Sequence, residues 1–229
     1  PLFNNLMGIL KSTEGEILYN GEQIKYDKKS LYNLRKEVGI VFQDPEKQIF
    51  YSMVYDDIAF ALRNIGMDEK TIKDRIHTAL EAVNGLQFID RPVHNLSFGQ
   101  KKRVAIASVV AMENKLVLLD EPTAGLDPIS TRAIVDIIKG LNDRGVKIII
   151  SSHDMNLIYE ICDYVYVLNQ GVLINEGTRA EVFVNEEKIN EAGLELPWLV
   201  KLHKNMGLPL FPKEEDLYSF WNKQAQKTV

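Results

Sequence analysis

Two adjacent carboxylates, Asp120 and Glu121, stand directly after the apolar run 116–119 and are the first candidates for chemistry in this chain. An apolar run of this kind is typical of a strand buried in a parallel sheet, and α/β proteins bind ligands at the carboxyl ends of such strands. A bare Asp-Glu pair is more often an acidic strand end that only caps the following turn. The neighbouring segments must therefore decide between the two interpretations.

A second candidate site lies at residues 96–100, Leu-Ser-Phe-Gly-Gln, which are followed by Lys101, Lys102 and Arg103. A serine hydroxyl, a glycine without a side chain and the unpaired amides at a helix start are groups that bind an anion. The three cations are expected to strengthen the positive field there. A serine-capped helix without any ligand explains Ser-x-Gly equally well, so the argument rests on the full five-residue pattern.

Three further polar residues stand where predicted elements begin or end. Gln43 and His153 each follow a predicted strand, and Asp127 precedes Pro128 at the start of a predicted helix. Each has an ordinary structural explanation, as a solvated turn residue, a satisfied polar residue and a helix N-cap, respectively. Taken one at a time, they indicate no function.

The elements that must position these residues alternate between strand and helix. The expected strands are 38–42, 115–120 and 146–152, the expected helices are 68–83, 99–112, 128–141 and 154–161, and hairpins are expected at 15–24 and 164–175. Near-continuous apolar runs indicate strands buried on both faces, and hence a parallel sheet covered by helices. Residues from about 50 to 113 are expected to form a helical insert between core strands.

Composition limits the class of protein. The 229 residues carry a net charge of −5, and 45% of them are hydrophobic. A nucleic-acid-binding protein more often shows a basic stripe, so we expect no nucleic-acid partner. Cys162 is the one cysteine, which excludes an internal disulfide in these residues. No apolar stretch reaches the roughly 18 residues of a spanning helix, so any link to a membrane is expected to run through a partner.

Three motifs together resemble the nucleotide-binding subunits of ABC transporters: residues 96–100, the run Leu-Leu-Asp-Glu-Pro at 118–122, and Ser-His-Asp at 152–154. In that family they are the signature motif, the Walker B motif and the switch histidine. The resemblance implies an α/β P-loop NTPase fold of the RecA-like type, with a parallel sheet core, a helical signature subdomain and antiparallel strands. It implies an ATPase domain over residues 1–184 and a C-terminal tail lobe over residues 185–229.

The resemblance also implies roles within one subunit. Asp120 would hold Mg²⁺ through water, and Gln43 would contact both the ion and the attacking water. Glu121 would be the general base, and His153 would hydrogen-bond the γ-phosphate. These roles suit phosphoryl transfer, which needs an oriented nucleophile and hard oxygen ligands for Mg²⁺.

Other implied roles act across a dimer. Ser97, Phe98, Gly99 and Gln100 would grip the γ-phosphate of ATP bound to the opposite subunit, and Asp127 would lie at the dimer seam. The implied cofactors are therefore ATP and Mg²⁺, and the implied partner is a second ABC ATPase subunit, identical or different.

Two stretches narrow the resemblance to the energy-coupling factor class, which includes the cobalt-type ATPases. They are residues 41–60, beginning Val-Phe-Gln-Asp-Pro-Glu-Lys-Gln-Ile-Phe, and residues 177–197. The class implies a membrane coupling protein and a substrate-binding membrane protein as partners, and a peripheral position on the cytoplasmic face of the membrane. It implies a transition-metal ion (cobalt or nickel) or a vitamin as cargo. A soluble ABC ATPase outside transport is the alternative.

The family's phosphate loop, G-x-x-x-x-G-K-[ST], does not occur in these residues. Residues 2–10 resemble the segment that follows that loop, so the chain is expected to begin just after its own phosphate loop and to be impaired as given. A catalytically incompetent cassette is a further alternative. The presence of Gln43, Ser97, Glu121 and His153 favours an active ATPase.

A docking surface for the coupling protein is expected in the stretch that follows Gln43. Tyr51 and Tyr55 are expected on that surface, whereas Phe60 is expected to pack inside the helical insert. The partner is expected to offer basic residues to Asp56 and Asp57.

Overall fold

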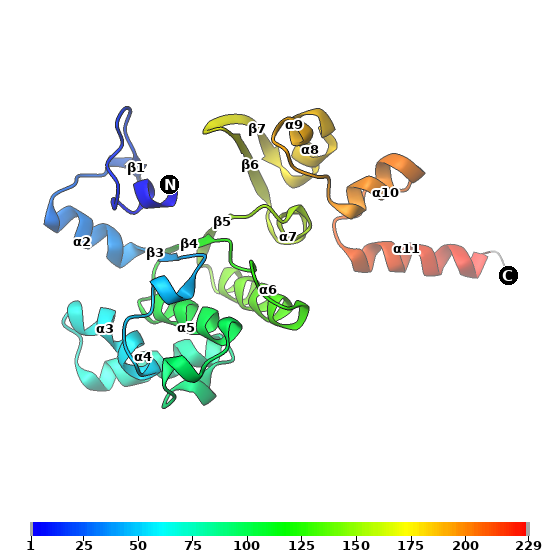
Figure 1. Ribbon diagram of the computed structural model, residues 1–229. Coiled ribbons are helices and arrows are strands. Elements are labelled where there is room, and N and C mark those ends of the chain that lie inside the picture. The colour runs from blue at the N-terminus through cyan, green and yellow to red at the C-terminus, as the bar shows by residue number, and fades with distance from the viewer. Residues whose placement is uncertain (1, 228–229) are drawn as a thin grey trace. The chain divides into compact units, whose positions relative to one another are not determined.

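The computed structural model describes residues 2–227, which form two compact units that meet between Ser151 and Ser152. The first unit carries a parallel sheet and most of the helices, and the second carries an antiparallel hairpin and the C-terminal helices (Figure 1). The predicted boundary between residues 184 and 185 lies inside the second unit and stays a prediction.

The sheet of the first unit consists of β3 (Val38–Val41), β4 (Leu116–Asp120) and β5 (Lys147–Ser151), paired in parallel in that order. Strand β4 is central, and Leu118 and Leu119 are fully buried because helices or strands cover every side of them. The parallel sheet predicted from the apolar runs is therefore confirmed. Its three strands begin and end within two residues of the predicted bounds.

Helices of the first unit begin where a side chain caps them. Asp68 accepts a hydrogen bond from the Thr71 amide (3.0 Å) at the start of α4 (Glu69–Ala82). The apolar face of α4, which includes Ile72 and Ile76, is buried. Residues 68–83 were predicted as this helix from the same cap and the same periodicity. The remaining helical elements of this unit are α1 (Leu2–Leu6), α2 (Lys28–Glu37), α3 (Val54–Asn64), α5 (Phe98–Ala111), α6 (Pro128–Asp143) and the 3₁₀ turns Pro45–Lys47, Leu86–Phe88 and Val93–Asn95.

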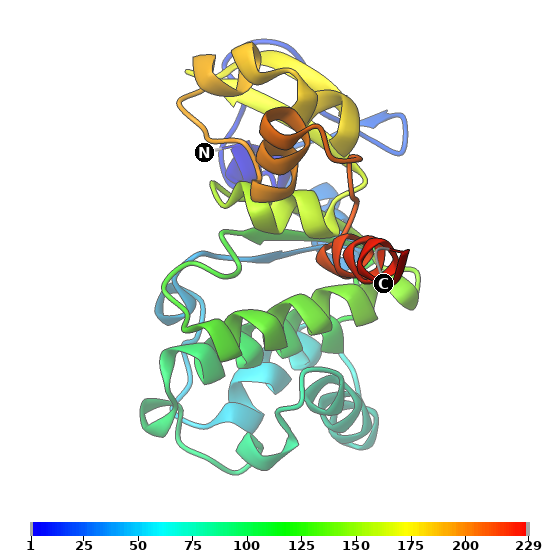
Figure 2. The same ribbon diagram turned by 90° about the vertical axis from the view of Figure 1, so that its right-hand side faces the viewer.

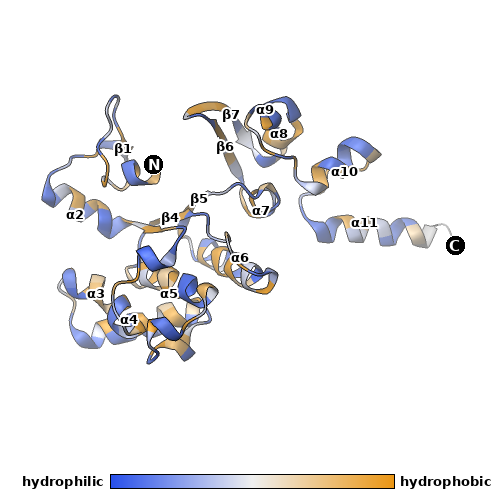
Figure 3. Ribbon diagram, viewed as in Figure 1, coloured by the Kyte–Doolittle hydropathy of each residue, from blue (hydrophilic) through white to orange (hydrophobic). Residues whose placement is uncertain are grey.

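Helices α5 and α6 lie on one side of the sheet, with α3 and α4 farther from it (Figures 1 and 2). Strand β4 and much of α5 are apolar along their length (Figure 3), and Val104, Ala105 and Ala107 of α5 are fully buried. Because α5 is enclosed on nearly all sides, a polar side chain of this helix can reach the backbone of neighbouring segments. On another part of the sheet, Phe3 of α1 joins a buried cluster with Leu118.

Both hairpins predicted from their turns are confirmed. Strands β1 (Leu18–Tyr19) and β2 (Glu22–Gln23) are antiparallel, and positive φ angles at Asn20 (52°) and Gly21 (81°) define a type I′ turn. In the second unit β6 (Tyr164–Asn169) pairs with β7 (Val172–Thr178).

The second unit is held together around α7 (Met155–Ile161). The Tyr159 hydroxyl donates to the Phe211 carbonyl (3.1 Å), and the Asn156 side chain accepts from the Trp198 amide (2.9 Å). These contacts fix C-terminal residues onto the same unit as α7. Its other helices are α8 (Arg179–Val184), α9 (Glu186–Glu191), α10 (Trp198–Met206) and α11 (Glu214–Lys227). Within residues 2–227, no helix combines the length and the apolar character needed to span a membrane.

Candidate functional site

The strand register brings three predicted site residues of the first unit to one edge of the sheet. Val41 pairs with Leu119 across parallel strands, so Gln43, two residues further on, leaves the same edge as Asp120 and Glu121. Gln43 is exposed, and the two acidic residues are half-buried. Parallel strands present their carboxyl ends together, which is why separate sequence motifs meet here.

Backbone contacts define the conformation of Glu121. Its φ angle is +45°, a left-handed value that residues other than glycine rarely adopt. Its amide donates to the Ser151 carbonyl (2.9 Å), and the Ser151 hydroxyl donates to the side chain of Asp120. Strand β5 therefore supports both acidic residues, a contribution by Ser151 that the sequence did not indicate.

Lys102 supports the same turn from α5. Its side chain is 1% exposed, and Nζ donates to the carbonyls of Glu121 (2.6 Å) and Ala124 (3.4 Å). Burial lowers the pKa of Lys102 to about 8, and nearby carboxylates, Glu121 first among them, oppose that shift. The ammonium also lies 5.8 Å from the centre of the Phe98 ring. A lysine that looked like part of a surface charge run is thus an internal residue.

The start of α5 is a capping box. Ser97 Oγ accepts from the Gln100 amide (3.3 Å), and Gln100 Oε1 accepts from the Ser97 amide (2.9 Å). The serine cap is therefore real, and it leaves the amides of Phe98 and Gly99 as first-turn donors of the helix. A Cβ on Gly99 would lie 3.0 Å from Ser130 Oγ, so glycine allows α5 to approach α6 closely.

Asp127 is the N-cap of α6, as one of its two interpretations predicted. Its carboxylate accepts from the amides of Ile129 (3.0 Å) and Ser130 (2.9 Å) and from the Ser130 hydroxyl (2.6 Å). The hydrogen bonds from Ser130 are the main reason why the pKa of Asp127 is lowered. Because Ser130 also lies against Gly99, the starts of α5 and α6 are direct neighbours. The role of Asp127 at a dimer seam stays a prediction.

The three cations of this run each contact a group of the same unit. Lys101 pairs with Glu46 (2.5 Å), Lys102 is buried, and Arg103 donates to the Asn84 carbonyl (3.0 Å). The positive field that they are expected to strengthen stays a prediction. We call Ser97–Arg103 and Asp120–Asp127 together the carboxyl-edge corner.

Gln48 links α5 to the strand that precedes Gln43. Its Oε1 accepts from the Phe42 amide (3.0 Å), and its Nε2 donates to the carbonyls of Ile40 (3.3 Å) and Ala105 (3.5 Å). The sequence suggested no such role, because a glutamine in a polar stretch resembles a solvated residue.

His153 belongs to the second unit, where it is exposed directly after β5 and ahead of the α7 N-cap, Asp154. The predicted strand before it and the predicted helix after it are both present. Its predicted contact with a γ-phosphate stays a prediction.

The residues of the edge suit a shared Mg²⁺ site rather than a self-contained one. In the part of the chain that the structure describes, no group of three or more His, Cys, Asp or Glu side chains could hold a metal ion. Mg²⁺ in phosphoryl-transfer sites uses one or two protein ligands together with phosphate oxygens and waters. Asp120 and Gln43 offer oxygen ligands of that kind at the open edge of the sheet.

A second surface of the first unit carries exposed aromatic rings. Phe50 is 78% exposed and Tyr51 43% exposed, and Phe60 is 41% exposed with its ring centre 5.5 Å from that of Tyr51. The expectation that Phe60 packs inside the insert is therefore wrong, because α3 turns this residue outward. We call Phe50, Tyr51 and Phe60 the aromatic surface.

The two acidic residues near this surface are engaged internally. Asp57 is buried, and its Oδ1 accepts from the amides of Phe50 (2.8 Å) and Tyr51 (3.1 Å). Burial raises the pKa of Asp57, and these two hydrogen bonds oppose the rise. Asp57 therefore supports the loop from within, and the expectation that it faces a basic partner is wrong.

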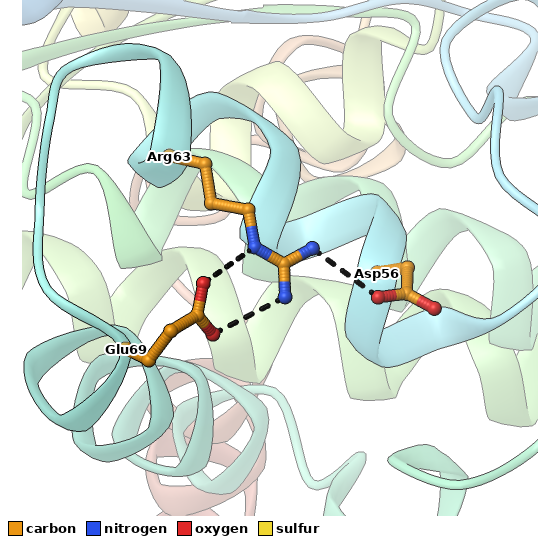
Figure 4. A network of polar contacts seen from close by, with 3 residues as sticks. All are labelled: Asp56, Arg63 and Glu69. Atoms are coloured by element: carbon orange, nitrogen blue, oxygen red, sulfur yellow. Dashed lines mark hydrogen bonds and ion pairs between the residues drawn. The ribbon is translucent and has the colours of Figure 1, made fainter.

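Asp56 is the other acidic residue, and it belongs to an ion-pair network. Arg63 lies between Asp56 (3.3 Å) and Glu69 (2.8 Å), as Figure 4 shows. The guanidinium already supplies a positive partner for Asp56. Hydrophobic contact, rather than an acidic patch, is what this surface offers.

Comparison with known proteins places these features in a family. The ABC transporter family model matches residues 1–124. The cobalt import ATP-binding protein CbiO of Salmonella typhimurium is 47% identical to the chain, over 98% of this chain and 83% of that protein. The energy-coupling factor transporter ATP-binding protein EcfA of Methanocaldococcus jannaschii is also 47% identical, over 88% of this chain and 72% of its own length.

A solved structure is similar over most of the chain. It is cbiO1 from Clostridium perfringens, described as part of the ABC transporter complex cbiONQ. The TM-score is 0.74 at 42% identity, covering 89% of this chain and 81% of that one. The likeness confirms the predicted fold class, an α/β P-loop fold with a parallel sheet and antiparallel strands.

Proposed function

The chain belongs to the ABC transporter family, as an ATP-binding subunit, and on that premise we propose that it binds and hydrolyses ATP to power an energy-coupling factor importer. The observation that carries this proposal is the carboxyl-edge corner. There the backbone of Glu121 is held in a left-handed conformation between Ser151 and Lys102, beside Asp120. Two carboxylates at a strand end become informative when the surrounding structure fixes one of them so closely.

In this proposal Glu121 is the general base for the attacking water. Phosphoryl transfer needs little covalent chemistry from the protein, so positioning and charge stabilisation supply most of the catalysis. The clamped backbone of Glu121 limits where its carboxylate can lie, which suits a group that must orient a water. Asp120 would hold Mg²⁺ through water, and Gln43 would contact both the ion and the attacking water. Mg²⁺, when bound, neutralises phosphate charge.

His153 would hydrogen-bond the γ-phosphate, from its place after strand β5. A neutral or charged imidazole can donate a hydrogen bond to a phosphate oxygen and so stabilise negative charge in the transition state. The support for this role is the family resemblance together with the place of His153 directly after a core strand.

Two copies, or this chain and a related one, would complete each site. The capping box leaves Ser97, Phe98, Gly99 and Gln100 at the open end of α5, where backbone amides and the helix dipole favour an anion. That end would receive the γ-phosphate of ATP bound to the opposite subunit. Asp127 would lie at the seam, because the starts of α5 and α6 are neighbours.

The membrane partner would dock on the aromatic surface. Exposed rings such as Phe50 and Tyr51 are typical of protein interfaces, where aromatic anchors contribute much of the binding energy. A membrane coupling protein, together with a substrate-binding membrane protein, would hold this subunit peripherally at the cytoplasmic face. The cargo would be a transition-metal ion, as the name of the CbiO relative suggests for that protein, or a vitamin.

A catalytically incompetent cassette is the second candidate, favoured by the absence of a G-x-x-x-x-G-K-[ST] sequence from the 229 residues. That loop supplies most contacts to the β- and γ-phosphates. We therefore propose that these residues by themselves bind ATP weakly, and that turnover needs a G-x-x-x-x-G-K-[ST] loop in addition to them. Titration of the 229 residues with a fluorescent ATP analogue and Mg²⁺ tests this, and micromolar binding would contradict it.

The catalytic proposal is tested by Glu121→Gln in a protein in which these residues follow a G-x-x-x-x-G-K-[ST] segment. The amide keeps the shape of the side chain but cannot take a proton, so we expect ATP to stay bound while phosphate release falls by about 100-fold to 10,000-fold. The control is Glu113→Gln, which changes an exposed glutamate just after the C-terminal end of α5 and should leave turnover unchanged. Turnover of Glu121→Gln near the unmodified rate would remove Glu121 from the mechanism.

A further inference from the structure

Lys102 is the buried lysine of the run Lys101-Lys102-Arg103, and its burial calls for an explanation. Its ammonium group is buried and donates to two backbone carbonyls, those of Glu121 and Ala124. Burying a charged amine is costly even when it is hydrogen-bonded, so an apolar side chain would serve stability as well or better. The hydrogen bonds of Lys102 are therefore better explained by the positioning of the Glu121 turn than by a gain in stability.

The two carbonyls bracket the turn that carries the candidate general base. Glu121 has a positive φ angle, which is unfavourable for a residue other than glycine and persists where the surroundings enforce it. Ser151 holds the amide side of this residue, and Lys102 holds the carbonyl side. With both peptide groups fixed, the direction of the Cα–Cβ bond of Glu121 is fixed as well.

The other end of the contact is the helix whose first turn carries the signature residues. Lys102 stands two residues after Gln100, within the second turn of α5, and its ammonium lies 5.8 Å from the ring of Phe98. Gly99 is pressed against Ser130 of α6. The side chain therefore connects two parts of the carboxyl-edge corner that act on different ATP molecules in the proposed dimer.

We propose that Lys102 is a positioning residue, which sets the turn of Glu121 relative to the start of α5. The base is then correctly placed only when the first turn of α5 is also correctly placed. This inference rests on the proposed role of Glu121. Lys102 touches neither nucleotide nor water in this account and acts through the backbone of another residue. Without its ammonium the Glu121 carbonyl is free to rotate, and the left-handed turn can relax.

The test uses Lys102→Met in the same protein, in which these residues follow a G-x-x-x-x-G-K-[ST] segment. Methionine keeps the length and the apolar stem but donates no hydrogen bond. Because a misplacement of about 1 Å costs roughly 100-fold, we expect kcat to fall by about that factor while KM for ATP stays within about twofold. Lys102→Arg should restore part of the lost kcat, since a guanidinium can donate to the same carbonyls. Lys115→Met, at an exposed lysine before β4, is the matched control.

A double-variant cycle separates positioning from a merely structural role. If Lys102 acts through the Glu121 carboxylate, adding Lys102→Met to Glu121→Gln should not lower the residual turnover further. Independent, multiplying losses would overturn the inference, as would a kcat of Lys102→Met within about twofold of the unmodified protein. Should Lys102→Met fail to fold, the same cycle with Lys102→Gln, whose amide can donate to one carbonyl, decides between a positioning role and a structural role.

The outcomes also separate this inference from the proposed function. Full turnover in Glu121→Gln would refute the proposed base and, with it, the basis for this role of Lys102. Loss of turnover in Glu121→Gln combined with normal kcat in Lys102→Met would leave the proposed function standing and refute the inference alone.

Discussion

The carboxyl-edge corner and the aromatic surface lie in the same unit and treat their side chains in opposite ways. In the corner a charged lysine is buried and donates to two backbone carbonyls, whereas on the aromatic surface Phe50 leaves 78% of a large apolar side chain in water. Each arrangement goes against the ordinary preference of its residue type, because lysine prefers water and phenylalanine prefers the interior.

The difference fits the roles that we propose for the two regions. A corner that must place one carboxylate accurately uses internal hydrogen bonds, which are directional and resist small shifts. A surface that awaits another protein can leave apolar rings exposed, because their burial is completed on binding. Asp57 joins the two patterns, since it is a buried acid whose purpose is to hold the exposed loop at Phe50 and Tyr51.

The largest effect should come from disturbing the packing of β3 against the C-terminal part of α5, the helix whose start belongs to the corner. A Cβ on Gly39 of β3 would lie 2.3 Å from Val109 Cγ1 of α5 and 2.6 Å from Asn114 Oδ1. We expect Gly39→Ala to lower the free energy of unfolding by about 3 kcal/mol, because α5 must shift or the strand must bend. Urea unfolding followed by circular dichroism gives the measurement.

The matched control is Gly140→Ala in α6, where a Cβ would meet nothing within 4 Å. Alanine is the better helix residue, so this variant should be more stable by up to about 1 kcal/mol. Equal stabilities for the two variants would show that α5 is not closely packed on the sheet.

The next effect concerns the support under the aromatic surface. Asp57→Ala leaves the amides of Phe50 and Tyr51 without their acceptor and should cost about 1–3 kcal/mol in thermal or urea unfolding. Asp57→Asn is the control, because its amide oxygen can accept both bonds. A loss in the asparagine variant as large as in the alanine variant would assign the effect to charge instead of to the acceptor.

The difference in stability between the native protein and Asp57→Asn depends on pH with a definite sign. The pKa of Asp57 is raised by burial above its usual value of 3.8, so the unfolded chain gives up its proton first as the pH rises. The stability of the native protein relative to Asp57→Asn therefore falls as the pH rises through the folded pKa, and in acid the difference between the two no longer depends on pH. Unfolding curves measured between pH 4 and neutrality should show this relative stability falling with pH.

The smallest effect on the isolated subunit should come from the aromatic surface itself. Phe50→Ala removes a ring that is mostly in water, so we expect the free energy of unfolding to change by less than about 0.5 kcal/mol. Co-purification with the membrane coupling protein should nevertheless fall sharply. Tyr166→Ala, at a tyrosine of β6 that is 63% exposed, is the control and should leave co-purification unchanged. Equal recovery of both variants with the membrane fraction would place the docking surface elsewhere.

The sequence by itself determined the three strands of the sheet, several of the helices and the edge on which the candidate chemistry lies. Strand β4, the cap at Asp68 and the Asp127-Pro128 start of α6 follow from local patterns of apolar residues and caps. Local signals act over a few residues and survive in any fold that uses them. The Asp27 cap of α2 is a signal of the same kind.

Only the tertiary structure decided which polar residues are internal. Lys102 and Glu121 lie 19 positions apart in the chain, and nothing in the run Lys101-Lys102-Arg103 distinguishes the lysine that is buried from its neighbours. Asp56 and Asp57 are equally alike in sequence, although one forms ion pairs at the surface and the other caps a loop from within. The cost of burying a charge depends on which carbonyls and amides surround it, and those come from segments that only the folded chain brings together.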